Sequence, residues 1–148
     1  MAEFGFYHLR TQPLERALPR LLEKVVERGH RVLLLAESAE RAAALDAVLW
    51  TFDPASFLPH GLASQGHAAQ QPVLIATEPD DRNRADVLVL VDGMDVAETG
   101  AFARCLDLFD GNDDAAVAAA RERWRRRKAQ GHALTYWQQD DKGAWAKQ

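Results

Sequence analysis

Three short stretches of this chain carry continuous apolar residues, with no alternation between apolar and polar positions. They are residues 31–36 (RVLLLA), 72–76 (PVLIA) and 86–91 (DVLVLV). A strand with one face in water alternates, whereas a parallel strand covered on both faces is apolar along its length. The three stretches therefore predict central strands of a sheet that is buried on both sides.

The segments around these strands predict the other elements of an α/β fold. A further strand is expected at 4–9, and helices at 13–28, 38–49 and 115–130. Residues 50–71 are predicted to form a long loop. Residues 96–109 are ambiguous between a short helix alone and a helix followed by a strand at 105–109. Short aromatic segments follow at 134–137 and at Trp145. Strand–helix–strand order implies right-handed crossovers and a mainly parallel sheet. We expect a Rossmann-like three-layer sandwich with helices on both faces, formed by residues 1–148 as one domain.

No apolar run is longer than six residues, far short of the roughly 20 that a membrane-spanning helix needs. Residues 1–10 lack a basic segment followed by an apolar core, so no secretory signal is expected. Cys105 is the only cysteine and cannot form an internal disulfide. These features predict a protein of the reducing cytosol, without a membrane partner.

The charge is unevenly distributed along the chain. The formal net charge is −4, but residues 121–148 hold eight basic and three acidic residues, a net charge of +5, while residues 1–120 hold ten basic and nineteen acidic residues, a net charge of −9. A mildly acidic total argues against a general nucleic-acid coat protein. The concentrated basic end predicts one local anionic partner.

Signatures of enzyme chemistry are missing from the sequence. The turn after the first strand, residues 8–13, has no glycine that would let backbone amides approach a pyrophosphate, and no phosphate-binding P-loop motif occurs. The five histidines form no metal-ligand pattern, so we expect no nucleotide-binding loop, no cofactor and no metal. His60 is interpreted as a hydrogen-bonding residue that fixes its loop, and Cys105 as a small core residue.

The last predicted helix, at 115–130, carries apolar, aromatic and basic residues in one stripe along its side. Val117, Arg121, Trp124 and Lys128 follow at spacings of four, three and four, and Arg125 flanks them. Six basic residues in eight positions repel one another, and an anion would relieve that repulsion. The mixture suits an acidic peptide with a hydrophobic anchor or a terminal carboxylate. The alternative is a solvated polar face with Trp124 in the core.

The loop at 50–71 is unusually apolar and gives a second candidate interface. Its candidate anchors are Trp50, Phe57, Leu58 and Pro59, with Phe52 between them. Exposed clusters of this kind mark protein interfaces. The alternative, equally supported by the sequence, is that the loop folds down and caps the sheet.

Five motifs in order resemble the chi subunit of bacterial DNA polymerase III. They are FYHL (6–9), LDxxLW (45–50), SFLPH (56–60), QPV (71–73) and ARERW (120–124). The SFLPH motif after LW is the most specific. The resemblance runs from the first strand to the last helix.

The resemblance implies a non-catalytic, Rossmann-like accessory of the clamp loader that binds no nucleotide and works with the replisome in the cytoplasm. It implies capture of the acidic C-terminal tail of single-stranded DNA-binding protein, and through it only indirect contact with single-stranded DNA. Arg121 would hold a carboxylate, Lys128 would add cationic contact, and Val117 and Trp124 would supply apolar contact. Some relatives have a basic residue at the position of Val117, so this site is expected to be less cationic. The aromatic loop resembles the surface that faces the psi subunit, with Trp50, Phe57 and Pro59 as anchors.

Two other functions are compatible with parts of the sequence. The basic helix could bind single-stranded nucleic acid directly, with Trp124 stacking on bases. The apolar strands would also suit a nucleotide-using enzyme without recognised motifs, although fold does not imply function.

Overall fold

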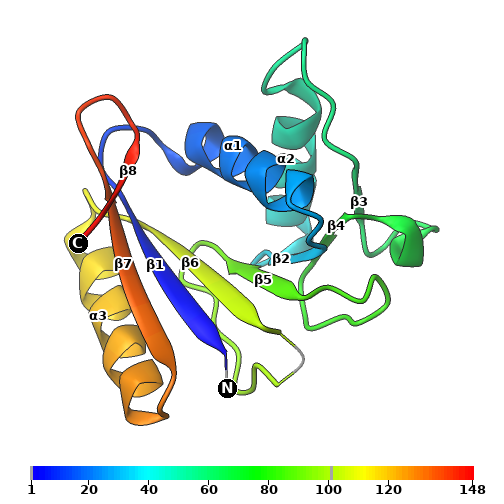
Figure 1. The fold of residues 1–148 in the computed structure, drawn as a ribbon. Helices are drawn as coiled ribbons and strands as arrows, with labels where there is room; N and C mark the ends of the chain where they lie inside the picture. Colours follow the sequence, from blue (N-terminus) through cyan, green and yellow to red (C-terminus); the bar gives the residue numbers. More distant parts are fainter. Residues whose placement is uncertain (1, 101) are drawn as a thin grey trace.

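The computed structural model describes residues 2–100 and 102–148, and an eight-stranded sheet forms its centre (Figure 1). The strands are β1 (Glu3–Leu9), β2 (Val32–Leu35), β3 (His60–Leu62), β4 (Val73–Ala76), β5 (Val87–Leu90), β6 (Arg104–Asp110), β7 (Ala133–Gln139) and β8 (Trp145–Lys147). Their order is β3-β4-β2-β5-β6-β1-β7-β8. All neighbours run parallel except β7 and β8. The expected mainly parallel α/β sheet is confirmed.

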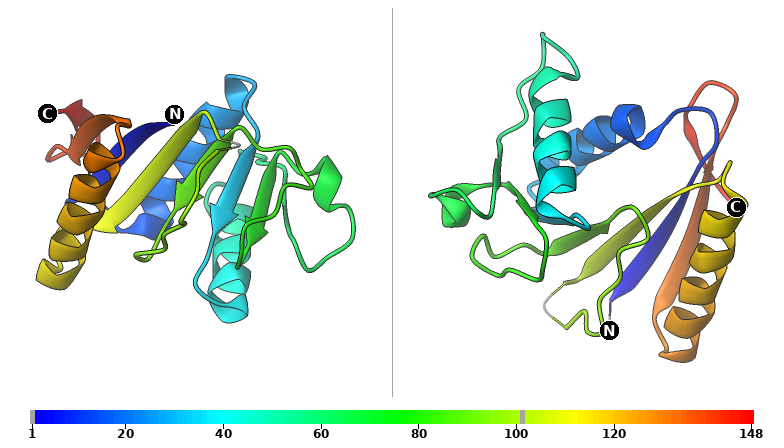
Figure 2. Two further views of the ribbon diagram at one scale, coloured as in Figure 1. Left: turned by 90° about the horizontal axis from the view of Figure 1, so that it is seen from below. Right: turned by 180° about the vertical axis from the view of Figure 1, so that it is seen from behind.

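Helices α1 (Leu14–Glu27) and α2 (Ala39–Thr51) cover one face of the sheet, and α3 (Asp114–Ala129) covers the other (Figure 2). Ser38 caps α2 by accepting a hydrogen bond from the Arg41 N–H at 3.1 Å. Asp113 caps α3 by accepting from two backbone N–H groups of its first turn. Three layers therefore form as the sequence predicts.

The central strands are buried because both of their faces meet apolar layers. Val32 and Leu34 point to the α1 and α2 side, whereas Leu33 and Leu35 point to the opposite side. All four are at most 1% exposed. This explains the absence of alternation in their sequence.

The second face is only partly covered by a helix. α3 packs over β6, β1 and β7, while the segment after β5 covers the rest with Met94, Val96 and Phe102. The short helix expected from residue 96 is wrong: the described residues 96–100 and 102–103 are irregular. The irregular segment spreads Met94, Val96 and Phe102 over the sheet face, whereas a helix would hold its apolar side chains on one narrow stripe. The strand expected at 105–109 is confirmed, since β6 contains it.

The segment 50–71 also differs from a featureless loop. α2 runs on to Thr51, β3 adds a short strand at the sheet edge, and a single 3-10 turn follows at Ala68–Gln70. β3 has three residues, too few to show a period of two in the sequence. Its place is decided by pairing with β4.

Within the described residues, no helix is long and apolar enough to cross a membrane.

Candidate functional site

Three arginines of α3 hold the helix to the rest of the fold. Arg123 donates to Asp107 of β6 through Nε at 2.7 Å and Nη2 at 3.0 Å, and both side chains are buried. Arg127 is 2% exposed and pairs with Asp95, as does Arg126. The Arg127 guanidinium also lies 4.8 Å from the ring centre of Phe4. The expectation that these arginines need an outside anion is therefore wrong for these three, because each already pairs with a carboxylate from residues 1–120, Arg126 and Arg127 sharing Asp95.

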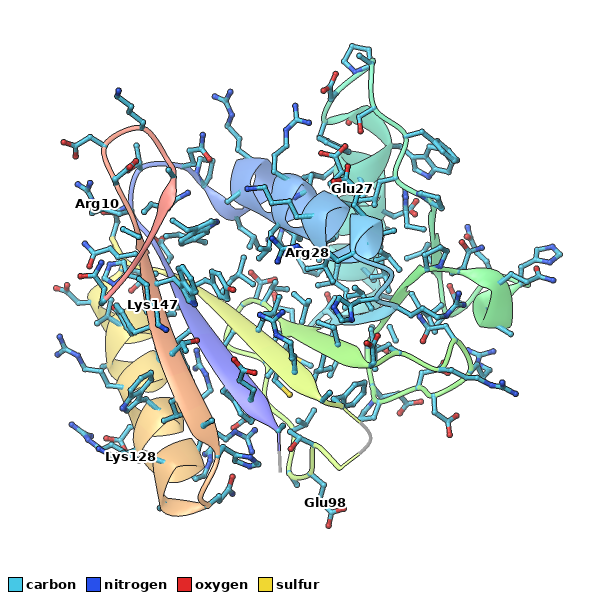
Figure 3. The ribbon with its side chains drawn as sticks, viewed as in Figure 1. Arg10, Glu27, Arg28, Glu98, Lys128 and Lys147 are labelled. Atoms are coloured by element: carbon cyan, nitrogen blue, oxygen red, sulfur yellow. The ribbon has the colours of Figure 1, made fainter. Side chains whose placement is uncertain are left out.

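The remaining cations of α3 lie on its outer side. Arg125 pairs with Glu122 on the same helix, and both side chains are exposed. Arg121 and Lys128 are exposed and make no ion pair with any described residue. Figure 3 shows Lys128 pointing away from the sheet. The anion-attracting charge of α3 is thus confined to one side.

A small apolar pocket opens beside Arg121. Its volume is about 190 Å³, and aromatic and aliphatic side chains from α3, β1, β6 and β7 line it together with Arg121. The lining residues are Phe6, Phe109, Val117, Ala120, Arg121, Trp124 and Tyr136. The Trp124 ring meets Phe6 edge-on at 5.3 Å and Tyr136 at 6.0 Å between ring centres. The walls are therefore held by packing before any ligand arrives.

His8 lies next to this pocket, two residues beyond Phe6 on β1 and therefore on the same face of the sheet. Its Nδ1 forms a hydrogen bond with the hydroxyl group of Tyr136, and its ring packs against Phe109 at 5.1 Å. Burial lowers the pKa of His8, the positive charges of Arg10 and Arg121 lower it further, and Asp110 opposes them. Burial raises the pKa of Tyr136, so its hydroxyl group stays protonated at neutral pH.

The predicted stripe of α3 is only partly assembled around the pocket. Val117, Arg121 and Trp124 line it, whereas Arg125 and Lys128 do not. Trp124 is half-buried, so it serves both the packing on the sheet and the pocket wall. The partners Phe6, Phe109 and Tyr136 were missed in the sequence because they come from three strands. Their aromatic character was visible, but their meeting depends on strand order.

The candidate anchors of the second predicted interface, in the segment 50–71, differ in their exposure to solvent. Trp50 is 57% exposed and Phe57 is 72% exposed, with their ring centres 6.3 Å apart. Pro59 is half-buried. Leu58 corrects the expectation of an accessible anchor, since it is 3% exposed and packs into the core beneath α2. Both sequence alternatives hold in part: the loop caps the core with Leu58 and presents the two aromatic rings outward.

His60 fixes this loop, as expected. Its Nδ1 lies 2.7 Å from the Leu58 carbonyl oxygen, and its ring packs 4.7 Å from the Trp50 ring. Its Nε2 lies 3.2 Å from Asp46 Oδ1. Contact with the buried imidazole therefore helps to fix the orientation of the Trp50 ring.

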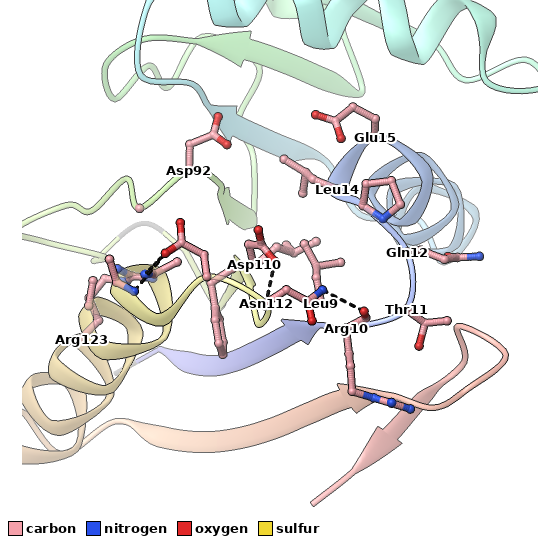
Figure 4. Close-up of a pocket in the computed structure, with 18 of the residues that line it drawn as sticks. Leu9, Arg10, Thr11, Gln12, Leu14, Glu15, Asp92, Asp110, Asn112 and Arg123 are labelled. Carbon is pink, nitrogen blue, oxygen red and sulfur yellow. Dashed lines mark hydrogen bonds between the residues drawn. The ribbon is translucent and has the colours of Figure 1, made fainter.

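A larger cleft of about 800 Å³ lies at the carboxyl ends of β1 and β6, between the first turns of α1 and α3 (Figure 4). Doubly wound folds bind ligands at this position. Here four carboxylates line the cleft, and Arg41, one of its three arginines, already pairs with two of them. The four are Glu15, Asp92, Asp110 and Asp113. Such a lining repels phosphate.

The turn from β1 to α1 is closed by a side chain. The amide oxygen of Gln139 accepts hydrogen bonds from the backbone N–H groups of Arg10, Thr11 and Gln12 at 2.9, 3.1 and 3.0 Å. Backbone N–H groups after the first strand hold the pyrophosphate in dinucleotide-binding folds. In this chain the equivalent donors are already used.

The described residues contain no group of three or more His, Cys, Asp or Glu side chains placed to hold a metal ion. Cys105 is fully buried, as expected for a core residue, and burial raises its pKa to about 12. Its thiol is therefore not a nucleophile in the folded protein.

Known proteins resemble this chain over most of its length. A family model described as DNA polymerase III chi subunit, HolC, matches residues 1–135. The DNA polymerase III subunit chi of Haemophilus influenzae is 30% identical over 142 residues, covering 91% of this chain and 96% of that protein. The one of Escherichia coli K12 is 33% identical over 107 residues, 72% of each chain. The probable DNA polymerase III subunit chi of Rickettsia prowazekii is 31% identical over 98 residues, 66% of this chain and 59% of that protein.

Proposed function

The chain belongs to the DNA polymerase III chi subunit family, and we propose that it is a non-catalytic accessory subunit in DNA replication that links the clamp loader to single-stranded DNA-binding protein. In this proposal the apolar pocket beside α3 receives the acidic C-terminal tail of the binding protein. The observation that carries the proposal is the pocket of four aromatic side chains with Arg121 at its edge, where no described residue pairs with this arginine.

The chemistry of the pocket supports a peptide that ends in an apolar residue next to carboxylates. Its volume of about 190 Å³ is close to that of one large side chain. Arg121 presents a guanidinium group that holds a carboxylate through two parallel hydrogen bonds. Val117 and Trp124 contact the apolar side chain, and Arg125 and Lys128 attract the preceding acidic residues from the outer side of α3. Their long-range contribution weakens as salt screens it.

The test is titration calorimetry with a synthetic peptide, Asp-Asp-Asp-Leu-Phe, that has a free terminal carboxylate. We expect Arg121→Ala to weaken binding about 10- to 100-fold, as loss of a charge-assisted pair costs about 1.5–3 kcal/mol. Arg16→Ala is the matched control, because Arg16 is an exposed arginine of α1 on the opposite face. Equal affinity of the Arg121→Ala variant and the control would refute the site.

Direct binding of single-stranded DNA is the competing use of α3. The edge-on packing of Trp124 against Phe6 and Tyr136 leaves less of its ring free for base stacking. Titration of the protein with an oligonucleotide in the absence of any partner separates the two functions. Tight binding to the oligonucleotide, with none to the peptide, would replace the proposal.

We also propose that the exposed pair of Trp50 and Phe57 contacts the psi subunit or another clamp-loader component. Large exposed aromatic side chains with fixed orientation are the typical anchors of protein interfaces. Phe57→Ala should abolish co-purification with that component and leave peptide binding unchanged. Arg121→Ala should show the reverse pattern. Loss of both partners in either variant would contradict two separate surfaces.

A further inference from the structure

His8 is a titratable side chain in contact with the pocket walls, and the proposed function does not use it. It lies on β1, its Nδ1 is hydrogen-bonded to the Tyr136 hydroxyl group, and its ring packs on Phe109 and Tyr136 at 5.1 and 5.9 Å. Both of these aromatic residues line the pocket. The imidazole therefore supports two walls of the pocket without lining it.

The imidazole is confined by the backbone that follows β6. A Cβ atom at Gly111 would lie 1.9 Å from His8 Nε2 and 2.5 Å from the Leu9 carbonyl oxygen. The side chain thus fills the space above Gly111. This contact favours one orientation of the ring, with Nδ1 toward Tyr136.

We propose that His8 and Tyr136 form a proton-accepting pair at the pocket wall, so that an acidic peptide binds together with a proton. This inference rests on the proposed function, since it assumes that a carboxylate occupies the pocket beside Arg121. His8 is then a positioning residue that acts on the ligand through Tyr136.

The hydrogen bond between the two residues has two arrangements. With neutral His8, Nδ1 can accept the Tyr136 O–H, and the phenol then has no donor to offer. With protonated His8, Nδ1–H must donate to the Tyr136 oxygen, and the phenol hydrogen turns toward another acceptor. A carboxylate in the pocket supplies that acceptor.

The surrounding charges make the proton and the ligand cooperative. The charged groups near His8 are Arg10 after β1, Arg121 of α3 and Asp110 at the end of β6, and Tyr136 of β7 is its uncharged partner. Burial and the two arginines hold the pKa of His8 below its ordinary value, so the His8 side chain is neutral at pH 7 in the free protein. A carboxylate beside Arg121 offsets its positive charge and raises that pKa. Linkage then requires the affinity for the carboxylate to rise as the pH falls.

The test is calorimetric titration of the same peptide between pH 8.0 and 5.5, where its carboxylates remain ionised. Affinity should rise about 3- to 10-fold over this range, since one unit of pKa shift corresponds to tenfold in affinity. Buffers with different ionisation enthalpies should report uptake of a fraction of a proton. His8→Gln should remove both effects, and Tyr136→Phe, which keeps the ring, should reduce them. His67→Asn is the control, since His67 is exposed in the loop before β4 and its positive φ suits asparagine.

NMR titration of His8 in the unmodified protein avoids dependence on the variants. Its pKa should be higher in the peptide-saturated protein than in the free protein. Binding that requires Arg121, but has the same affinity at pH 8.0 and 5.5 or the same slope in His8→Gln, would overturn this inference and leave the proposed function standing. Absence of peptide binding at every pH would overturn both.

Discussion

Removing Arg123 from the buried ion pair with Asp107 should destabilise the protein strongly while its surface changes little. The two side chains are 7% and 3% exposed, and two hydrogen bonds of 2.7 and 3.0 Å join them. Arg123→Met keeps the length and apolar stem of the side chain. It leaves the Asp107 carboxylate buried without a partner, which costs about 3–5 kcal/mol of unfolding free energy.

The size of the loss distinguishes this pair from an exposed one on the same helix. At about 2–4 °C per kcal/mol for a chain of this length, Arg123→Met should lower Tm by about 6–20 °C. Arg125→Met is the matched control, because it removes an exposed pair with Glu122 worth at most about 1 kcal/mol. The double variant Asp107→Leu/Arg123→Met should recover most of the stability, since no buried charge remains.

The loss should also depend on pH. Burial raises the pKa of the Asp107 carboxyl, and Arg123 opposes that rise. Without Arg123 the folded-state pKa lies well above the unfolded one, so stability is present at low pH and is lost as the pH rises through the folded-state pKa. The deficit of Arg123→Met relative to the unmodified protein should therefore shrink between pH 7.5 and pH 5.

Urea denaturation followed by circular dichroism at both pH values measures these differences. The reasoning fails if Arg123→Met loses no more stability than Arg125→Met. It also fails if the deficit is the same at pH 5 and pH 7.5, because an unpaired buried carboxylate must titrate.

Three further changes probe other contacts of the fold. Gln139→Leu leaves three N–H groups of the turn after β1 without their acceptor and should cost about 2 kcal/mol in urea denaturation; an unchanged midpoint would mean that water replaces the amide. Gly111→Ala places a Cβ 1.9 Å from His8 Nε2 and should destabilise by about 1–3 kcal/mol, with a changed His8 NMR signal, whereas an unchanged spectrum would contradict the packing. Cys105, fully buried with a pKa of about 12, should not react with iodoacetamide at pH 8 until the protein is unfolded in urea, and rapid labelling of the folded protein would refute its burial.

Much of the architecture could be read from local patterns. Continuous apolar residues at 31–36, 72–76 and 86–91 predicted strands covered on both faces, because burial on both sides removes the need for polar positions. The caps that Ser38 and Asp113 provide to α2 and α3 are local as well, since each side chain accepts from a backbone N–H group two or three residues further on. The irregular segment after β5 was misread as a helix, because its conformation follows the sheet face that it covers.

The candidate site, like the fold, was predictable from the sequence only in part. The sequence alone determined that Val117, Arg121 and Trp124 share one side of a helix, because the period of 3.6 residues places them there. The sequence also showed that residues 121–148 are basic and residues 1–120 are acidic. It did not distinguish cations that serve the fold from cations that face outward, since Arg123 and Arg127 differ from Arg121 only in what lies opposite them.

Tertiary structure alone decided those partners. Asp107 and Asp95 neutralise Arg123 and Arg127 because β6 and the segment after β5 pass beneath α3. Strand order β6-β1-β7 brings Phe6, Phe109 and Tyr136, which lie up to 130 residues apart, around one pocket. Contacts between strands depend on the pairing of the whole sheet, so no local pattern encodes them. The basic residues behind the net charge of +5 on residues 121–148 thus have different roles. Two arginines are buried in ion pairs, and a few other cations face outward beside an apolar pocket.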